Sequence, residues 1–225
     1  MMSFQRARSA EQRAERSRVI LDTAAGMLAE MPVEQVSLNE LSRRVGLAKS
    51  NVLRYFESRE AVLLELLDAA SREWLEQLGD ALTAAVDAGA APSGRGDQLA
   101  AALATSLAGR PVLCDLISAQ AAVLERNVSP QVAAKFKRAA LANIAVLARL
   151  MLEHVPELGE RDAWRLAGAT MIVTGAVWTQ SRPAAAMLAA YEADPALAAM
   201  RLDFTTTLRE MLEVLIAGLR AHPSR

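Results

Sequence analysis

The sequence predicts an all-α protein made of a three-helix head and a larger helical domain. Apolar residues recur at three- and four-residue spacing along almost the whole chain of 225 residues, which is the period of amphipathic helices. No segment shows the sustained alternation, bounded by hairpin turns, that is typical of strands. Proline and glycine punctuate the periodic segments where helices are expected to end. We therefore expect the head in residues 1–58 and the larger domain in residues 59–225.

Three helices are expected in the head. The first covers residues 11–30 and the third covers residues 49–56, with a short helix between them. Ser37 and Glu40 have the spacing of a capping box, in which each residue satisfies a backbone donor at the start of the second helix. Gly46 is suited to the left-handed conformation that ends a helix. These local signals place the second helix between Ser37 and Gly46.

Six further helices are expected in the larger domain. Ser58 can cap a long helix that runs to about residue 86. The following segment, residues 87–97, is rich in Gly, Ala, Pro and Ser and is predicted to be a loop. Beyond this loop, helices are predicted at residues 98–108, 111–127, 130–154, 161–181 and 195–221.

Composition narrows the class of protein. A content of 52% hydrophobic and 23% charged residues is typical of a folded globular chain. Cys114 is the single cysteine, and with only two histidines an ordinary Cys/His zinc site lacks ligands. There is no phosphate-binding Gly-Lys-Ser/Thr loop, no G-x-S-x-G and no H-E-x-x-H motif, so we expect no cofactor, no metal and no enzymatic activity.

Neither end of the chain indicates a membrane or secreted protein. The arginine-rich amino terminus lacks the apolar core of a signal peptide, and no later segment approaches the roughly 20 apolar residues needed to cross a bilayer. We therefore expect a cytoplasmic protein without a membrane partner.

Charge is distributed unevenly along the chain. Residues 1–59 carry ten Lys and Arg against seven Asp and Glu, a net charge of +3, whereas residues 60–225 carry fifteen against nineteen, a net charge of −4. A basic end can bind nucleic acid or an anionic lipid surface. On charge alone, a solvated helix face bearing arginines explains the same count.

Residues 38–56 have the spacing of a helix-turn-helix, in which two short helices are joined by a turn that contains glycine. At 100° per residue, the third helix places Val52, Leu53 and Phe56 on one face and a polar group of residues on the other. Asn and Arg side chains suit base edges and phosphates, and Tyr and Ser hydroxyls suit phosphate oxygens. The outward face of the third helix is therefore chemically suited to DNA.

Residues 36–67 closely resemble the DNA-binding segment of the TetR family of bacterial transcriptional repressors. The matching run is Gly46, a short recognition helix that ends in Tyr55-Phe56, and then Ser58-Arg59-Glu60 at the start of the linking helix. The match covers about residues 11–68 and is specific there. For the rest of the chain it depends on the number and order of the helices.

Two departures from the family pattern concern the operator and not DNA binding itself. Ala48 stands where a small hydroxyl residue is usual, and Leu53 stands where many members have tyrosine. The resemblance therefore implies a double-stranded DNA operator without implying its sequence. The expected DNA contacts are Ser37, Arg44, Lys49, Ser50, Asn51, Arg54, Tyr55 and Arg59.

The resemblance also implies a homodimer, in which the last two long helices of each subunit form a four-helix bundle. The stripes of apolar and small residues on these helices can also be intramolecular core. The expected interface residues are Gly168, Ile172, Gly175, Ala176, Phe204, Leu208, Met211 and Leu215.

A small-molecule pocket in the larger domain is the third implication. Small-ligand sites are mostly apolar cavities with a few polar groups, although any one such residue can be plain core instead. The candidates are Trp74, Leu78, Leu103, Leu107, Cys114, Ile117, Gln120, Phe136, Asn143, Met171, Thr174 and Trp178.

The expected function is a DNA-binding transcriptional regulator, a repressor released from a near-palindromic operator when a small-molecule effector binds the larger domain. Two alternatives stay open. The first is an activator, or a regulator controlled by a partner protein. The second is an all-α small-molecule binder or enzyme in which the helix-turn-helix is vestigial.

Overall fold

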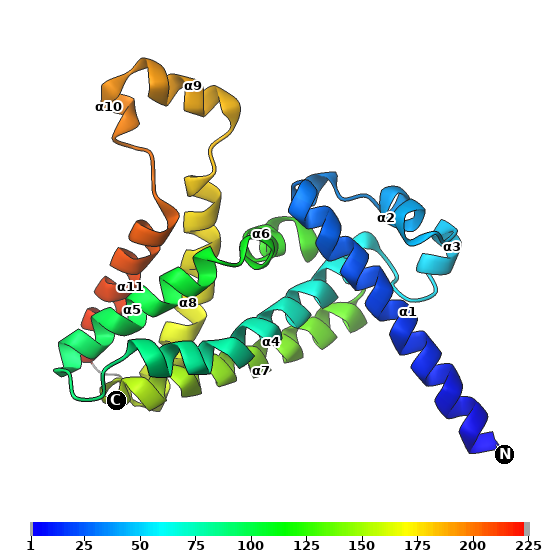
Figure 1. Cartoon of the computed structure of the whole chain (residues 1–225), viewed down its shortest axis with the longest axis horizontal. Helices are drawn as coiled ribbons and strands as arrows, with labels where there is room; N and C mark the ends of the chain where they lie inside the picture. The colour runs from blue at the N-terminus through cyan, green and yellow to red at the C-terminus, as the bar shows by residue number, and fades with distance from the viewer. Residues whose placement is uncertain (1, 223–225) are drawn as a thin grey trace.

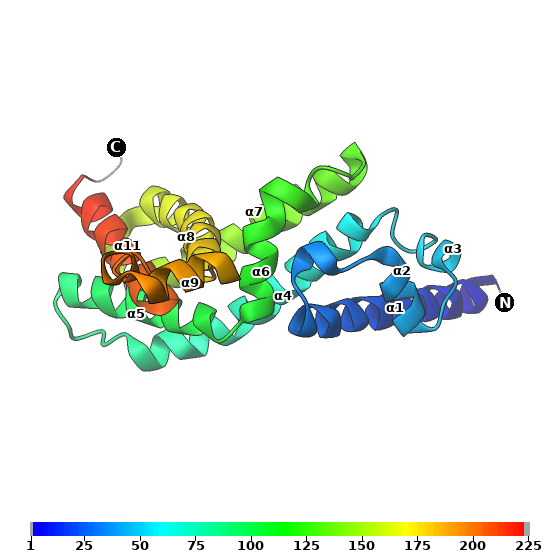
Figure 2. The same ribbon diagram turned by 90° about the horizontal axis from the view of Figure 1, so that it is seen from above.

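A computed structural model describes residues 2–222, with side chains from residue 11 onward, and no residue in this range lies in a strand. The all-α prediction is confirmed. The helices form a head at one end of the molecule and a larger body at the other, and α4 runs from the head into the body (Figures 1 and 2). Two short helices, α9 and α10, stand away from the body.

The head consists of α1 (Met2–Glu30), η1 (Val33–Gln35), α2 (Leu38–Val45) and α3 (Lys49–Val52). Its core is the one expected from helical spacing, because Ile20 and Met27 of α1 are fully buried. Leu41 of α2 and Val52 of α3 are buried with them, at 1% and 0% exposure. Helix α1 starts before residue 11, the expected position.

Helix α3 is shorter than predicted, and its second half is a turn. It was expected to reach Phe56 but ends at Val52. The chain then turns back toward Ser58, whose extended backbone and side chain cap the next helix. Because the 100° period no longer applies after Val52, the prediction that Leu53 faces the core is wrong, and this side chain is 41% exposed.

The body is built on α4 and α7, which lie side by side, with α5, α6, α8 and α11 packed around them (Figures 1 and 2). Helix α11 packs against both α5 and α8. A π-helical turn, η2 (Gln120–Leu124), continues α6, and a short 3-10 helix, η3 (Pro156–Leu158), precedes α8. The bounds are α4 Arg59–Ala85, α5 Pro92–Ala108, α6 Pro111–Ala119, α7 Pro130–His154, α8 Gly159–Ser181 and α11 Phe204–Ala221.

The predicted loop at residues 87–97 is wrong in its second half, because α5 begins at Pro92. Proline is well suited to the first turn of a helix, where its missing N–H has no partner to lose. One of the glycines that suggested a loop, Gly96, has another role here. A Cβ on Gly96 would lie 2.9 Å from Cγ2 of Ile216, so Gly96 allows α5 and α11 to approach closely.

The predicted helix at residues 195–221 is broken. Helix α9 (Ala185–Ala193), which the sequence did not indicate, and α10 (Pro195–Ala198) precede α11, and neither contains a buried residue. Helix α11 starts only at Phe204, because the Asp203 carboxylate accepts a hydrogen bond from Thr206 N–H at 2.8 Å and caps it.

Among residues 2–222, no single helix is both long and apolar enough to cross a lipid bilayer. Two pairs of consecutive helices meet the requirement only when each pair is counted together. These pairs, α5 with α6 and α7 with α8, are bent by 94° and 111°.

Candidate functional site

Local hydrogen bonds fix the helix-turn-helix. Ser37 caps α2, since its Oγ accepts the backbone N–H of Glu40 at 3.1 Å. The reciprocal half of the predicted capping box is absent, because the Glu40 carboxylate binds Arg43 and Arg44 instead. Gly46 adopts the left-handed conformation at φ 72° and ends α2, as predicted. The turn that follows sets the direction of α3.

Helix α3 and the turn after it present an exposed polar row, which consists of Lys49, Ser50 and Asn51 of the helix and Arg54 of the turn. Within the described part of the chain, no hydrogen bond or ion pair engages these four side chains. Val52, on the inner face, is fully buried and anchors the helix. The row is therefore held by the backbone while its functional groups stay available to an external partner.

Tyr55 and the end of the row are braced by α1. The guanidinium of Arg13 lies 5.7 Å from the centroid of the Tyr55 ring, and its Nη2 donates to the carbonyl oxygen of Arg54 at 3.1 Å. Tyr55 is half-buried. Sequence reasoning did not identify Arg13, because its partners lie about forty residues away along the chain.

Two of the residues predicted to contact DNA, Arg44 and Arg59, make intramolecular contacts instead and do not join the polar row. Arg44 pairs with Glu30 at 2.7 Å and Glu40 at 2.8 Å. Arg59 has a side chain that is only 20% exposed, and it donates to the carbonyl oxygen of Val33 at 2.7 Å. Arg59 thus ties the start of α4 to η1.

The charge cluster on α2 stays ionised at neutral pH. Hydrogen bonds from Arg43 and then Arg44 lower the pKa of Glu40 from 4.5 to about 2. Glu40 is therefore ionised throughout the neutral range and pairs with both guanidinium groups. In this arrangement Arg44 is engaged by Glu40 and does not join the polar row.

A cavity of about 550 Å³, called here the central cavity, lies between α4, α6, α7 and α8. It includes the start of the π-helical turn, a distortion that often occurs at functional sites. Part of its α8 wall is exposed to solvent, at Ile172 and Ala176. Six of the predicted pocket residues line it: Trp74, Ile117, Gln120, Phe136, Asn143 and Met171.

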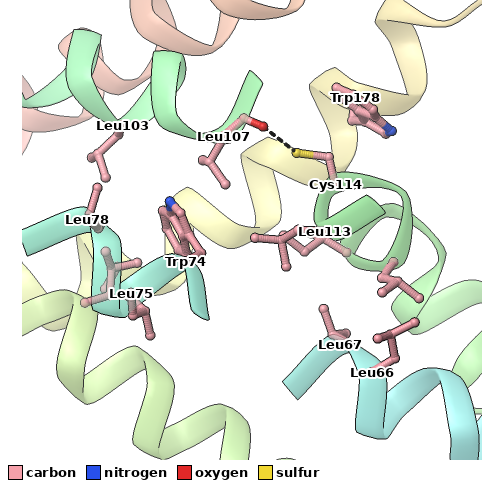
Figure 3. Packing of buried hydrophobic residues seen from close by; sticks show 14 of the residues in the cluster. Leu66, Leu67, Trp74, Leu75, Leu78, Leu103, Leu107, Leu113, Cys114 and Trp178 are labelled. Atoms are coloured by element: carbon pink, nitrogen blue, oxygen red, sulfur yellow. Dashed lines mark hydrogen bonds between the residues drawn. The ribbon is translucent and has the colours of Figure 1, made fainter. Parts of the chain in front are cut away.

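The other six predicted pocket residues do not line this cavity and lie in the core around it: Leu78, Leu103, Leu107, Cys114, Thr174 and Trp178. Figure 3 shows Leu78, Leu103 and Leu107 packed near Trp74. The Trp74 indole N–H donates to Ser106 Oγ of α5 at 3.1 Å, so its polar edge is directed toward α5. Trp178 donates to Asp115 Oδ1 at 2.6 Å and contacts the edge of Phe204. An apolar helix pattern does not distinguish these positions from a cavity wall.

The polar lining residue Asp68 was missed. Its Oδ1 accepts a hydrogen bond from Asn143 Nδ2 at 2.9 Å, and its Oδ2 pairs with Arg72 at 3.1 Å. On the buried side of α4, the polar residues Asp68 and Ser71 lie between the apolar residues Leu67 and Trp74. Polar residues on an otherwise apolar helix face were the sequence feature that could have identified Asp68.

The head and α4 are tied to the amino-terminal half of α7 by polar contacts. The Glu57 carboxylate accepts the backbone N–H of Ser129 at 2.6 Å. Lys135 pairs with Glu65 at 2.6 Å, in addition to the bond between Asp68 and Asn143.

A second cavity, of about 460 Å³, lies between the head and α7. It is lined by Leu53, Arg54 and Tyr55 of the head. Asp68 and Phe136 line both this cavity and the central one. These two residues therefore separate the central cavity from the segment that ends the polar row.

The surface of α8 and α11 exposes large apolar side chains, named here the interface face: Trp164, Ile172, Met211 and Val214. Ile172 and Val214 are 75% and 72% exposed, which is unusual for residues of this type. Of the predicted interface residues, Ile172, Ala176 and Met211 are exposed, and Gly168 and Leu215 are half-buried.

Three predicted interface residues are intramolecular instead. Phe204 and Leu208 are buried within the subunit at 8% and 0% exposure. A Cβ on Gly175 would lie 3.3 Å from Cγ2 of Ile117, so Gly175 serves the contact of α8 with α6. Helix α11 has apolar residues both on the face that packs within the subunit and on the exposed face. The sequence pattern did not distinguish these two faces.

Cys114 is expected to be unreactive in the folded protein. It is fully buried, and its Sγ lies 3.3 Å from the carbonyl oxygen of Leu107 (Figure 3). Burial, with a smaller effect of Asp115, raises the pKa of the Cys114 thiol to about 12, so the nucleophilic thiolate is scarce at neutral pH. The disulfide reagent DTNB should label Cys114 only after denaturation. Rapid labelling of the native protein would contradict this assignment.

Sequence comparisons match both parts of the chain to one family. Residues 20–66 match the family model described as bacterial regulatory proteins, tetR family. Residues 68–223, more than half of the chain, match the model described as tetracyclin repressor-like, C-terminal domain. The HTH-type transcriptional regulator EthR of Mycobacterium tuberculosis is 39% identical over 54 residues, which are 24% of this chain and 25% of that protein. The chain thus matches only about a quarter of the length of this relative.

Solved structures share the fold over nearly the whole chain. A TetR transcriptional regulator from Rhodococcus sp. RHA1 is 14% identical with a TM-score of 0.58, covering 95% of this chain and 100% of that one. The regulator FadR from Bacillus subtilis, in complex with stearoyl-CoA, is 16% identical with a TM-score of 0.55, covering 89% and 98%. FadR from Bacillus halodurans is 16% identical with a TM-score of 0.55, covering 91% and 96%. At these identities the likeness establishes the fold alone.

Proposed function

The chain belongs to the TetR family of bacterial regulatory proteins, and from this premise we propose that it is a homodimeric repressor released from DNA by a small molecule. Members of the family are non-enzymatic DNA-binding transcription factors, so the helix-turn-helix is the DNA-binding part of the chain. One observation carries the proposal: α4 lines the central cavity with Leu67, Ser71 and Trp74, and it begins at Arg59, directly after the head. A ligand in the cavity therefore touches the helix that positions the polar row.

The polar row supports binding in the major groove. Recognition helices contact base edges with their exposed side chains, and Asn51 and Arg54 are types that bind adenine and guanine edges. Lys49 and Ser50 suit phosphate oxygens, which fix the position of the protein on the duplex. Operator affinity should therefore fall steeply with salt concentration.

The interface face supports a dimer. The four large apolar side chains of this face are exposed on two helices that pack against each other, and exposed apolar surface of this kind is typical of protein contacts. A two-fold dimer buries the same face of both subunits, so that α8 and α11 of each form a four-helix bundle. Such a dimer presents two polar rows to half-sites about one helical turn, or a multiple, apart on a near-palindromic operator.

The contacts of α4 support a route from the cavity to the DNA. The ties from Glu65 to Lys135 and from Asp68 to Asn143 hold α4 against α7. A ligand that separates these helices moves the start of α4 and, with it, the polar row. Because coupling is reciprocal, this ligand must bind free protein more tightly than DNA-bound protein.

A substitution that fills the central cavity tests the coupling between this cavity and the head, and it does not require the effector to be known. Ala140 lines the central cavity from α7, so Ala140→Trp places a large side chain where the ligand would lie. We expect this variant to bind operator DNA, selected from random sequences, about tenfold more weakly, in the range of known allosteric couplings. Fluorescence anisotropy measures the affinity.

Ala142→Trp is the matched control for this test. Ala142 is exposed on the same helix and does not line the cavity, so its substitution should leave operator affinity unchanged. Circular dichroism establishes that both variants are folded. Equal operator affinity in two folded variants would show that the central cavity is not coupled to the head.

A further inference from the structure

We infer that the central cavity selects a ligand with a protonated amine and an apolar body; this inference names the effector class and rests on the proposed function. Asp68 is the single charged residue among those that line the cavity in the described part of the chain. The lining contains no Lys, Arg or His. Most of the wall is apolar, and the polar remainder consists of hydroxyl and amide side chains.

The Asp68 carboxylate is placed to accept a ligand donor. Its side chain is 16% exposed, and its two recorded partners are Asn143 Nδ2 at 2.9 Å and Arg72 at 3.1 Å. An ionised carboxylate has about four acceptor sites, so these contacts leave capacity for another donor. Arg72 does not line the cavity and is 59% exposed, so solvent screens its side of this ion pair, and Asp68 is the partner that the cavity contains.

The aromatic wall favours the same charge. Trp74 and Phe136 both line the cavity. Because the Trp74 indole N–H is bonded to Ser106, this residue offers the cavity its carbon surface and not a donor. A cation near an aromatic face is attracted by the ring quadrupole, and this attraction increases when the site is dry.

The residues that line the cavity disfavour an anionic ligand. Its head group would be removed from water with no basic side chain lining the cavity to pair with it. It would also lie in the same cavity as the Asp68 carboxylate, and like charges repel strongly at low dielectric. A neutral ligand avoids this repulsion but makes no charge-assisted hydrogen bond with Asp68.

The test compares three probes that share one apolar chain and differ in the head group: decylammonium, decanol and decanoate. Isothermal titration calorimetry of the full-length protein, below the micelle concentration of each probe, measures the dissociation constants. We expect decylammonium to bind about tenfold more tightly than decanol, as one hydrogen bond to a charged group provides, and decanoate to bind most weakly. The substitution Asp68→Asn should remove the preference for decylammonium over decanol.

Asp80→Asn is the matched control, because it removes one carboxylate from an exposed position of the same helix outside the cavity. This variant should keep the wild-type order of the three probes. The inference is overturned if decanoate binds as tightly as decylammonium, if decylammonium does not bind, or if Asp68→Asn keeps the preference.

Operator binding is measured separately, so that the two proposals can fail independently. If decylammonium binds in the expected order and Ala140→Trp leaves operator affinity unchanged, the ligand class stands and the release mechanism fails. If Ala140→Trp weakens operator binding while the probe order is reversed, the release mechanism stands and the ligand class fails.

Discussion

Substitution of Lys49 or Arg54 by alanine is expected to weaken operator binding about tenfold in each case, because each change removes one charged contact to a phosphate or a base edge. Both side chains are exposed and engaged by no other group in the described structure. The slope of log affinity against log salt concentration should also decrease by about one for each lost phosphate contact. Fluorescence anisotropy over a series of salt concentrations measures both quantities.

A matched control separates these contacts from the effect of net charge. Arg138 is exposed on α7, outside the helix-turn-helix, so Arg138→Ala removes the same charge without touching the polar row. It should leave operator affinity nearly unchanged. If Lys49→Ala and Arg54→Ala bind as tightly as Arg138→Ala, then α3 is not the recognition helix.

Val214→Asp is expected to dissociate the dimer and to reduce operator affinity about a hundredfold or more. The side chain is 72% exposed in the subunit, so the substitution leaves the subunit fold intact. In a two-fold dimer the change occurs twice, and an unpaired buried carboxylate costs several kcal/mol. Analytical ultracentrifugation measures the oligomeric state, and anisotropy measures the affinity for the operator.

Leu141→Asp provides the comparison for this prediction. Leu141 is 56% exposed on α7 and lies outside the interface face, so its substitution introduces the same charge at another exposed apolar position. This variant should sediment as a dimer. A dimeric Val214→Asp protein would exclude the interface face as the dimer contact.

Local signals allowed the head to be predicted well. Ser37 and Gly46 act through hydrogen bonds and backbone angles within a few residues, and both have the roles that the sequence indicated. The core around Ile20 and Val52 follows from helical spacing alone. Information of this kind is contained in the order of neighbouring residues.

Tertiary partners explain the errors in the head. Arg59 was expected to face DNA, but its guanidinium binds the carbonyl of Val33, a residue brought near only by folding. Leu53 was expected to be buried, but α3 ends before it and changes its direction. In both cases the residue type was compatible with either location.

In the body, the apolar character of a residue does not indicate whether it packs in the core, lines a cavity or lies on the surface. Leu107 and Phe136 are both buried apolar residues within helices, yet only Phe136 lines the central cavity. Leu208 and Val214 lie on one helix, and only the packing of α11 against α5 and α8 decides which of them is buried. Such distinctions depend on the arrangement of several helices in space.

Gly96 shows the same dependence for a turn signal. Its flexibility suggested a loop, whereas its lack of a side chain is what the contact with Ile216 requires. A glycine in sequence has both properties at once. Only the position of α11 reveals which one is used.

The central claim, that paired α3 helices bind a near-palindromic operator, is tested most directly by nuclease footprinting on the DNA upstream of the protein's own coding region. We expect two protected half-sites about one helical turn, or a multiple, apart. About tenfold more Lys49→Ala protein should be needed for the same protection, and Val214→Asp protein should give none at the concentration at which the wild type protects. No protection at low salt, or protection that persists unchanged in both variants, would contradict the account.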